Sequence, residues 1–184
     1  YTDETFPSLN PARPSQVLAE VSQGTRELAE RAIEVANDAF ERWKKVPAAE
    51  RADYLFKAAA AMRERKHYFS AWMVYEVGKS WPEADADTAE DIDFLEYYAR
   101  QMIRLDETAT AQLTQIPTER AELRYIPLGV GAVIPPWNFP NAILTGMTSA
   151  AIVAGNSVVL KPASTSPVIG YQVAMLFHEV GLPA

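Results

Sequence analysis

Apolar residues recur at every third or fourth position between residues 25 and 45, which is the spacing of a helix with one buried face. The apolar positions are Leu28, Ala32, Val35, Ala36, Ala39, Phe40 and Trp43. Thr25 stands at the expected N-cap position, and Pro47 would break the helix. The pattern predicts an amphipathic helix that packs on a core through its apolar face.

The next stretch, residues 47–107, repeats this spacing three times and predicts three more helices that pack antiparallel to one another. Gly78 is a natural helix stop, and Pro82 suits the first turn of the helix that follows. The expected buried faces are Leu55, Ala58, Ala59 and Met62, then Phe69, Trp72, Met73 and Val77, then Ile92, Leu95, Ala99 and Met102. Most of residues 25–107 are therefore predicted to be helical.

The pattern changes between Thr108 and Val133, where β-branched and aromatic residues partly alternate with polar ones. The segments "TAQLTQI" and "AELRYIPLGVGAVI" are separated by the polar "PTER". We expect two strands that form a hairpin within residues 108–128 and run into a third strand.

From residue 129 to 184 the expected order is strand "GVGAVIP", helix "PNAILTGMTSAAIVAG", strand "NSVVLKP" and helix "SPVIGYQVAMLFHEVG". Short apolar strands alternating with helices indicate a parallel sheet that helices cover on both faces. The predicted fold class is α/β, with amino-terminal helices, part of a doubly wound Rossmann-like sheet and a hairpin.

Composition and charge narrow the possible partners. The chain has 48% hydrophobic residues, which indicates a globular core, and a net charge of −7 with a pI near 4.9, which argues against nucleic acid. No apolar run is long enough to span a membrane, and the start "YTDETFPSLN" lacks a signal pattern, so we expect a soluble, cytoplasmic chain. Its first residue, Tyr1, and its end at "HEVGLPA" suggest a piece of a longer protein.

Metal and hydrolase chemistry find no support in the sequence. The chain has no cysteine, and His67 and His178 have no partner at metal-ligand spacing. The acidic stretch "EADADTAEDIDFLE" lacks the pattern of a calcium loop, so we interpret it as a solvated helix face. We expect no metal site.

Asn138, in "IPPWNFPNAIL", is the first candidate for chemistry. The stretch lacks the third glycine of a dinucleotide fingerprint, and the following helix is expected to begin at Pro140. The Asn138 side chain could cap that helix, or its amide could donate to an oxygen that gains negative charge during attack on a carbonyl.

Lys161 ends the second apolar strand, at the sheet edge where open α/β folds bind ligands. It could bind a ribose hydroxyl or phosphate, or it could simply be solvated. Ser164 could be a helix cap or a ligand contact.

The pair "IPPWNFPNAIL" and "AGNSVVLKPAS" resembles the NAD(P)-dependent aldehyde dehydrogenase superfamily, whose pattern is P-W-N-F-P followed by G-N-x-V-V-x-K-P-A. The resemblance covers essentially the whole chain as that family's amino-terminal third. Within the superfamily, "YEVGK", "AEDIDFLEYYAR" and "TGM" are most similar to the 1-pyrroline-5-carboxylate (L-glutamate γ-semialdehyde) dehydrogenases.

The resemblance implies a division of the chain into three parts. Residues 1–107 would be the helical amino-terminal part of the cofactor-binding domain, residues 108–128 an oligomerisation hairpin, and residues 129–184 the β-α-β-α part of the NAD(P)-binding domain. The catalytic domain would be absent. The intact enzyme would be a homo-oligomer.

The resemblance also implies roles for individual residues. Asn138 would hold the aldehyde oxygen, which favours the donor alternative over capping. The residues implied to contact the cofactor are Ile134, Pro136, Trp137, Lys161 and Ser164. Phe139 would wall the aldehyde channel, and Glu83 would reach the substrate mouth.

Two positions bear on specificity. NAD-selective members commonly carry glutamate where this chain has Ser164, and serine cannot repel a 2′-phosphate, so NAD or NADP is the expected cofactor. Gly146 replaces a bulky tryptophan of simple-aldehyde members, which we interpret as room for a larger aldehyde such as glutamate semialdehyde. Another semialdehyde or an alkyl aldehyde remains the alternative substrate.

The family's nucleophilic cysteine and general-base glutamate are not among these residues. In the intact enzyme a cysteine thiolate would add to the aldehyde to give a thiohemiacetal, hydride would pass to NAD(P)+, and water would release the acid. We expect this chain by itself to be inactive. The competing hypothesis is a structural relative without catalytic activity.

Overall fold

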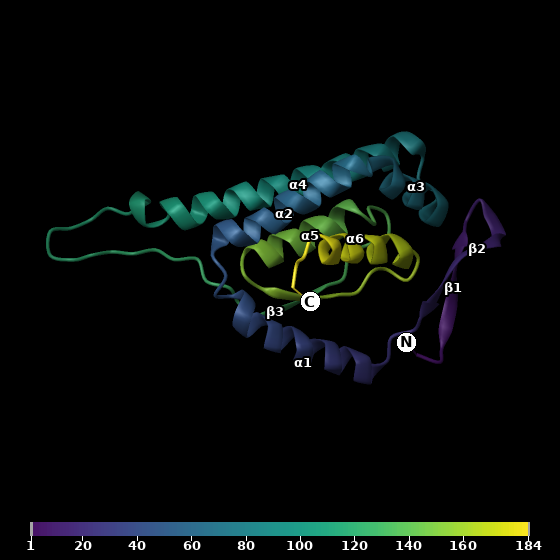
Figure 1. Cartoon of the computed structure of the whole chain (residues 1–184), viewed down its shortest axis with the longest axis horizontal. Helices are drawn as coiled ribbons and strands as arrows, with labels where there is room; N and C mark the ends of the chain where they lie inside the picture. The colour runs from purple at the N-terminus through teal and green to yellow at the C-terminus, as the bar shows by residue number, and fades with distance from the viewer. Residues whose placement is uncertain (1, 184) are drawn as a thin grey trace.

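The computed structural model describes residues 2–183 and shows a layer of helices packed on a small α/β unit (Figure 1). No helix among these residues is long and apolar enough to cross a membrane. The elements are β1 (Thr5–Asn10), β2 (Arg13–Ser22), α1 (Arg26–Trp43), α2 (Ala48–Glu64), α3 (Lys66–Val77), α4 (Trp81–Thr108), the 3-10 turn η1 (Thr110–Gln112), β3 (Val130–Val133), α5 (Ala142–Val153), β4 (Ser157–Leu160) and α6 (Pro167–Glu179).

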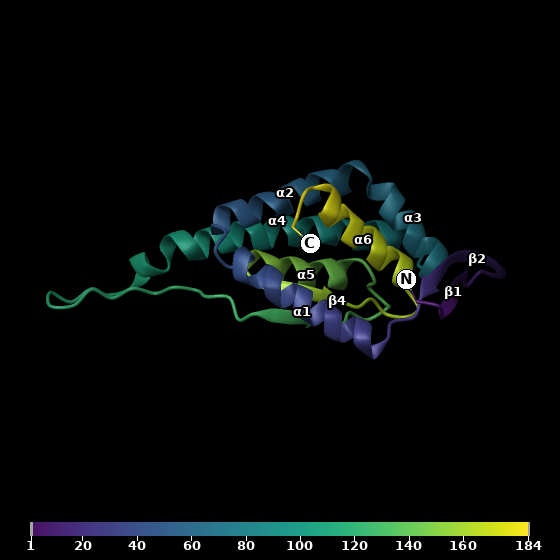
Figure 2. The ribbon, with the colours of Figure 1, turned by 60° about the horizontal axis from the view of Figure 1, so that its bottom comes forward.

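Helices α2, α3 and α4 form the helical layer, with α2 and α4 side by side along their length (Figures 1 and 2). The predicted apolar faces meet between them. Leu55, Met62, Phe69, Met73 and Leu95 are completely or almost completely buried there. Since burial of each such side chain contributes about 1.5–3 kcal/mol, this interface holds the layer together.

The predicted start of α1 at Thr25 and the predicted end of α3 at Gly78 are confirmed by capping contacts. The Thr25 hydroxyl accepts a hydrogen bond from the Leu28 backbone N–H at 3.3 Å. Gly78 ends α3 in the left-handed conformation, with φ of 67°, and Ser80 begins α4 in a reciprocal capping box with Glu83. These contacts satisfy N–H and C=O groups that a helix end leaves open.

The α/β unit has the predicted parallel arrangement. Strand β3 pairs with β4 in register from Val130 opposite Ser157 to Val133 opposite Leu160. Helices α1 and α5 both contact β4, and the Ser157 hydroxyl donates to the Ala36 carbonyl of α1 at 2.6 Å. The carboxyl ends of both strands therefore lie at one edge of the sheet, which is where α/β folds bind ligands.

The amino-terminal part that was predicted as helical, residues 1–107, also contains a hairpin before its first helix. Strands β1 and β2 pair antiparallel, from Thr5 opposite Ser22 to Asn10 opposite Arg13, with irregularities in register near Leu9. The hairpin packs on α3. Pro7 and Pro14, one in each strand, obscured the strand pattern because proline is found in sheets only in edge strands, at the first residue of a strand or at bulges.

The two predicted strands within residues 108–128 are not present as a ladder. Helix α4 continues to Thr108, η1 follows, and an isolated antiparallel bridge joins Ile116 to Glu119. The chain instead forms a long arm, residues 113–128, which projects from the body and returns to β3 (Figure 1). A two-stranded ribbon with no layer to bury its apolar side chains is too weak to hold a ladder by itself.

Candidate active site

A small pocket of about 220 Å³ brings together residues that are far apart in the sequence. It lies where the end of α3, the start of α4 and the loop between β3 and α5 meet. The lining residues are Val77, Lys79, Glu83, Trp137, Asn138 and Phe139. Four of the predicted site residues are among these six, so the structure places Glu83, Trp137, Asn138 and Phe139 around one cavity.

The loop that carries Asn138 leaves β3 at Val133 and reaches α5 at Ala142. The helix therefore begins later than the predicted Pro140, and its N-cap residue is the buried Asn141. Among the described residues, no hydrogen bond is formed by the Asn138 side chain, so the capping alternative for Asn138 is wrong. Its amide is exposed at the pocket and available as a donor.

Val77 and Lys79 are the two pocket residues that were not predicted as site residues, and Lys79 is the charged one. Its ammonium forms an ion pair with Asp87, donates to the Asn138 carbonyl oxygen at 3.2 Å, and lies 3.8 Å from the centre of the Phe139 ring. The Lys79 side chain is only 10% exposed. An ammonium held this way contacts the backbone of one predicted site residue and the aromatic face of another.

Asp87 links this lysine to the start of α5. Its Oδ1 accepts a hydrogen bond from the Ala142 backbone N–H at 2.7 Å, and its other oxygen faces Lys79. Burial raises the pKa of Asp87, while the hydrogen bonds from Lys79 and Ala142 oppose the shift. The carboxylate thus replaces the missing side-chain cap of α5.

A second acid on the same face, Asp91, is fully buried. Burial raises its pKa well above the ordinary aspartate value, and the Thr145 hydroxyl is the main group that opposes this shift. The interpretation of the acidic stretch as a solvated face is therefore wrong for Asp87 and Asp91. Both continue the three-to-four spacing of the buried α4 residues Ala84, Thr88, Ile92 and Leu95, which is the signal that could have placed them inside.

Glu83 lies on the pocket wall through its role in the capping box of α4. The Ser80 hydroxyl donates to its carboxylate at 2.6 Å, and the Ser80 backbone N–H donates at 3.3 Å. These bonds lower the pKa of Glu83, so the side chain presents a negative charge to the pocket.

The remaining predicted cofactor residues lie at the carboxyl edge of the sheet. Ile134 is 62% exposed directly after β3, and Pro136 is exposed two residues further on. Lys161 follows β4, where its backbone N–H donates to the Val133 carbonyl at 2.9 Å and its exposed ammonium donates to the Pro162 carbonyl at 3.1 Å. An apolar surface and a cation therefore adjoin at this edge.

Ser164 is exposed and does not cap the following helix, because α6 begins at Pro167 with Ser166 as its N-cap residue. The capping alternative for Ser164 is therefore wrong. The start of α6 is instead bound by Glu76 of α3, whose carboxylate accepts the Val168 and Ile169 backbone N–H groups at 2.8 and 2.9 Å. Burial raises the pKa of Glu76, and these bonds oppose that shift.

Gly146 faces the helical layer rather than open space. A Cβ placed on it would lie 3.0 Å from the ring of Phe94 on α4. The Phe94 ring stacks on Tyr98 and occupies the volume next to the glycine. The interpretation that Gly146 widens an aldehyde channel is therefore wrong, since an aromatic side chain from α4 fills the space.

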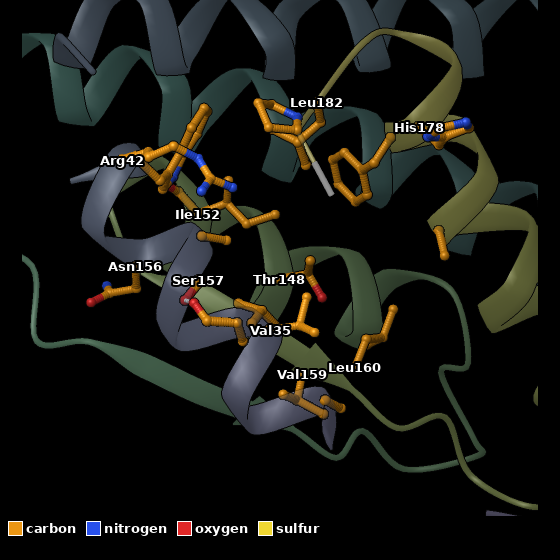
Figure 3. Close-up of a pocket in the computed structure, with 18 of the residues that line it drawn as sticks. Val35, Arg42, Thr148, Ile152, Asn156, Ser157, Val159, Leu160, His178 and Leu182 are labelled. Atoms are coloured by element: carbon orange, nitrogen blue, oxygen red, sulfur yellow. Dashed lines mark hydrogen bonds between the residues drawn. The ribbon is translucent and has the colours of Figure 1, made fainter. Parts of the chain in front are cut away.

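A larger groove of about 840 Å³ lies between α1, β4 and the end of α6 (Figure 3). Apolar side chains such as Val35, Ile152 and Leu160 line it, with Arg42 and His178 among its few charged or titratable groups. None of the predicted site residues lines this groove, and it shares no lining residue with the pocket around Asn138.

The parallel strands β3 and β4, with α1 and α5 packed on β4, form part of an α/β sheet whose carboxyl edge leads into the loop that carries Asn138. The sequence profile of the aldehyde dehydrogenase family matches residues 1–184. The chain belongs to the aldehyde dehydrogenase family.

Individual relatives agree with this assignment. A 1-pyrroline-5-carboxylate dehydrogenase from a Geobacillus species is 55% identical over 183 residues, which is 100% of this chain and 35% of the relative. The structure of 1-pyrroline-5-carboxylate dehydrogenase from Thermus with bound NAD superposes with a TM-score of 0.94 at 48% identity, over 99% of this chain and 35% of that protein. An NAD-dependent benzaldehyde dehydrogenase from Corynebacterium glutamicum gives a TM-score of 0.85 at 28% identity, over 100% of this chain and 39% of that protein.

The α/β fold class with a Rossmann-like sheet is confirmed by these matches. The chain spans about a third of the length of the relatives that it matches, and it corresponds to their amino-terminal portion.

Proposed function

We propose that this chain supplies the cofactor-facing and oxyanion-binding part of an NAD(P)-dependent aldehyde dehydrogenase that oxidises L-glutamate γ-semialdehyde. The observation that carries the proposal is the Asn138 amide, which lies in the pocket with Glu83 and Phe139 and has no hydrogen-bond partner among the described residues. A fixed neutral donor stabilises an oxygen that gains charge when a nucleophile adds to a carbonyl. The names of the Geobacillus and Thermus relatives support the choice of aldehyde.

The sheet edge fits a dinucleotide. Ile134 and Trp137 expose apolar surface beyond β3, and Lys161 offers an ammonium beyond β4. Apolar side chains suit an adenine and nicotinamide ring, and an ammonium suits a ribose hydroxyl or phosphate. Ile134, Pro136, Trp137, Lys161 and Ser164 would hold the cofactor, which when bound supplies the hydride acceptor. Ser164 carries no charge to exclude a 2′-phosphate, so both NAD and NADP are proposed.

The pocket also favours an aldehyde with a cationic group. Glu83 stays ionised because two hydrogen bonds lower its pKa, and it faces the same cavity as Asn138 and Phe139. An α-ammonium at the far end of a semialdehyde would be attracted to this carboxylate, while Phe139 would contact the methylene carbons. A plain alkyl aldehyde would gain nothing from Glu83.

The family relationship also supports a proposal about the domain division and the assembly. We propose that residues 1–107 and 129–184 belong to the NAD(P)-binding domain and that residues 108–128 contribute to a homo-oligomer interface. The arm exposes apolar side chains, with Ile126 76% and Leu128 95% exposed, which a second copy would cover. The cytoplasmic location predicted from the sequence stays a prediction.

The test replaces Asn138 with alanine in a full-length enzyme that contains this chain. We expect kcat for glutamate semialdehyde to fall on the order of 100-fold, the typical loss for one oxyanion donor. The matched control is Asn37→Ala, at an exposed position of α1 outside the pocket. A folded Asn138→Ala enzyme with unchanged kcat would contradict the proposal and support a structural relative without catalytic activity.

A further inference from the structure

Lys79 is fixed at the turn between α3 and α4. Gly78 takes a left-handed conformation with φ of 67°, and the Lys79 backbone N–H donates to the Met73 carbonyl at 3.3 Å. This turn directs the lysine side chain inward against α4 and the loop that carries Asn138. Asp87, its ion-pair partner, has a completely buried side chain.

The Lys79–Asp87 pair holds both ends of the segment 138–142. Lys79 binds the Asn138 carbonyl and covers the Phe139 ring, while Asp87 binds the Ala142 backbone N–H. A single ion pair therefore anchors the residue proposed to bind the oxyanion and the first residue of α5.

The Asn138 side chain has no hydrogen bond of its own among the described residues that would set its direction. The position of its amide must therefore come from the backbone, and the Lys79 ammonium is the polar side-chain group that holds this backbone at Asn138. A donor stabilises an oxyanion only when it is preorganised, and a displacement of about 1 Å can cost a catalyst about 100-fold.

The geometry assigns to Lys79, through its ion pair with Asp87, the role of a positioning residue for Asn138. This assignment rests on the proposed function of Asn138. The Lys79 ammonium is already engaged by a carboxylate, a carbonyl and an aromatic face, so it serves the loop rather than the substrate.

The test is a double-mutant cycle between Lys79→Met and Asn138→Ala in the full-length enzyme, followed by kcat for glutamate semialdehyde. We expect Lys79→Met to lower kcat about 10- to 100-fold. In the Asn138→Ala background the same change should lower kcat less than about threefold, because Lys79 acts on kcat by positioning the Asn138 amide and that amide is absent from this variant.

The matched control is Lys66→Met, which removes another lysine–aspartate pair between α3 and α4, with Asp85 at 2.7 Å, away from the pocket. It should leave kcat unchanged. If Lys79→Met fails to fold, Lys79→Arg keeps a cation beside Asp87 but moves its contacts with the loop, and it enters the same cycle in its place.

The outcomes separate the two proposals. Two results would overturn the positioning role while leaving the oxyanion role intact. One is a full additional loss of kcat from the Lys79 variant in the Asn138→Ala background, and the other is no loss of kcat from the Lys79 variant in the enzyme that keeps Asn138. An Asn138→Ala enzyme with unchanged kcat would instead refute the function on which both rest.

Discussion

The carboxylate of Glu76 binds the backbone N–H of Val168 across 92 positions of sequence, at 2.8 Å, and so fastens the start of α6 to the helical layer. The same carboxylate accepts from the Ile169 N–H and from the Ser8 hydroxyl. Asp87 makes the equivalent contact with Ala142 at the start of α5. The helical layer therefore sets the positions of both helices that follow the strands.

Glu76→Ala should lower the free energy of unfolding by about 2–4 kcal/mol, because it leaves two helix N–H groups and a buried hydroxyl without an acceptor. Urea titration monitored by circular dichroism would measure this. Glu64→Ala, at an exposed position of α2, is the control and should change stability by less than about 0.5 kcal/mol. Equal effects of the two substitutions would show that Glu76 does not hold α6.

Asp91→Asn should change how stability depends on pH. The folded-state pKa of Asp91 lies well above its unfolded value, so the contribution of Asp91 to stability is complete below about pH 4 and is lost as the pH rises toward the folded pKa. Asparagine does not ionise, so the variant should gain stability relative to wild type across that interval. Urea titrations from pH 4 to pH 8 would measure the difference, which the exposed Asp93→Asn should not reproduce. A constant difference at every pH would count against the prediction.

Gly170→Ala should destabilise the fold although alanine favours helices. The added Cβ would lie 2.5 Å from Cγ of Pro162, in the segment that follows β4, and 3.2 Å from Leu144. Such overpacking costs about 1–3 kcal/mol, more than the gain of about 1 kcal/mol in helix propensity. Gly24→Ala, with open space around its Cβ, is the matched control and should be neutral or slightly stabilising. Thermal unfolding would compare the two, and a stabilised Gly170→Ala chain would contradict the packing.

The purified 184-residue chain should not reduce NAD or NADP when it is mixed with glutamate semialdehyde. It contains no cysteine, so no thiolate can attack the carbonyl. The measurement is absorbance of the reduced nicotinamide, with a full-length relative as the positive control. Any turnover above that of buffer would require a different nucleophile within these residues.

Sequence patterns predicted the helices well where the decisive interactions are local. Thr25, Gly78 and the apolar stripe of α4 act within one helix or its ends, so their spacing was enough. The two strands expected within residues 108–128 were predicted wrongly. The alternating pattern of this segment is typical of strands, but no layer of this chain packs on the arm to bury their apolar side chains. The β1–β2 hairpin was missed because its prolines masked the strand pattern.

The candidate site divides in the same way. The sequence motif around Asn138 and the resemblance to the family predicted Asn138 and Glu83 as site residues. The ion pair of Lys79 with Asp87 was not predicted. That pair joins the turn before α4 to the interior of α4, and its role depends on which loop packs against it, which the sequence alone does not show. The space beside Gly146 was likewise misjudged, since the Phe94 ring that fills it comes from another helix.

The arm is also the expected site of proteolytic cleavage. Arg120 and Arg124 lie in the exposed arm, outside any helix or strand, whereas the chain before the arm ends in α4 and η1 and the chain after it enters β3. A brief exposure to trypsin should therefore nick the chain there first. Because α2 and α4 pack directly on α5, the two products should stay together as one particle on a sizing column and separate only in denaturant.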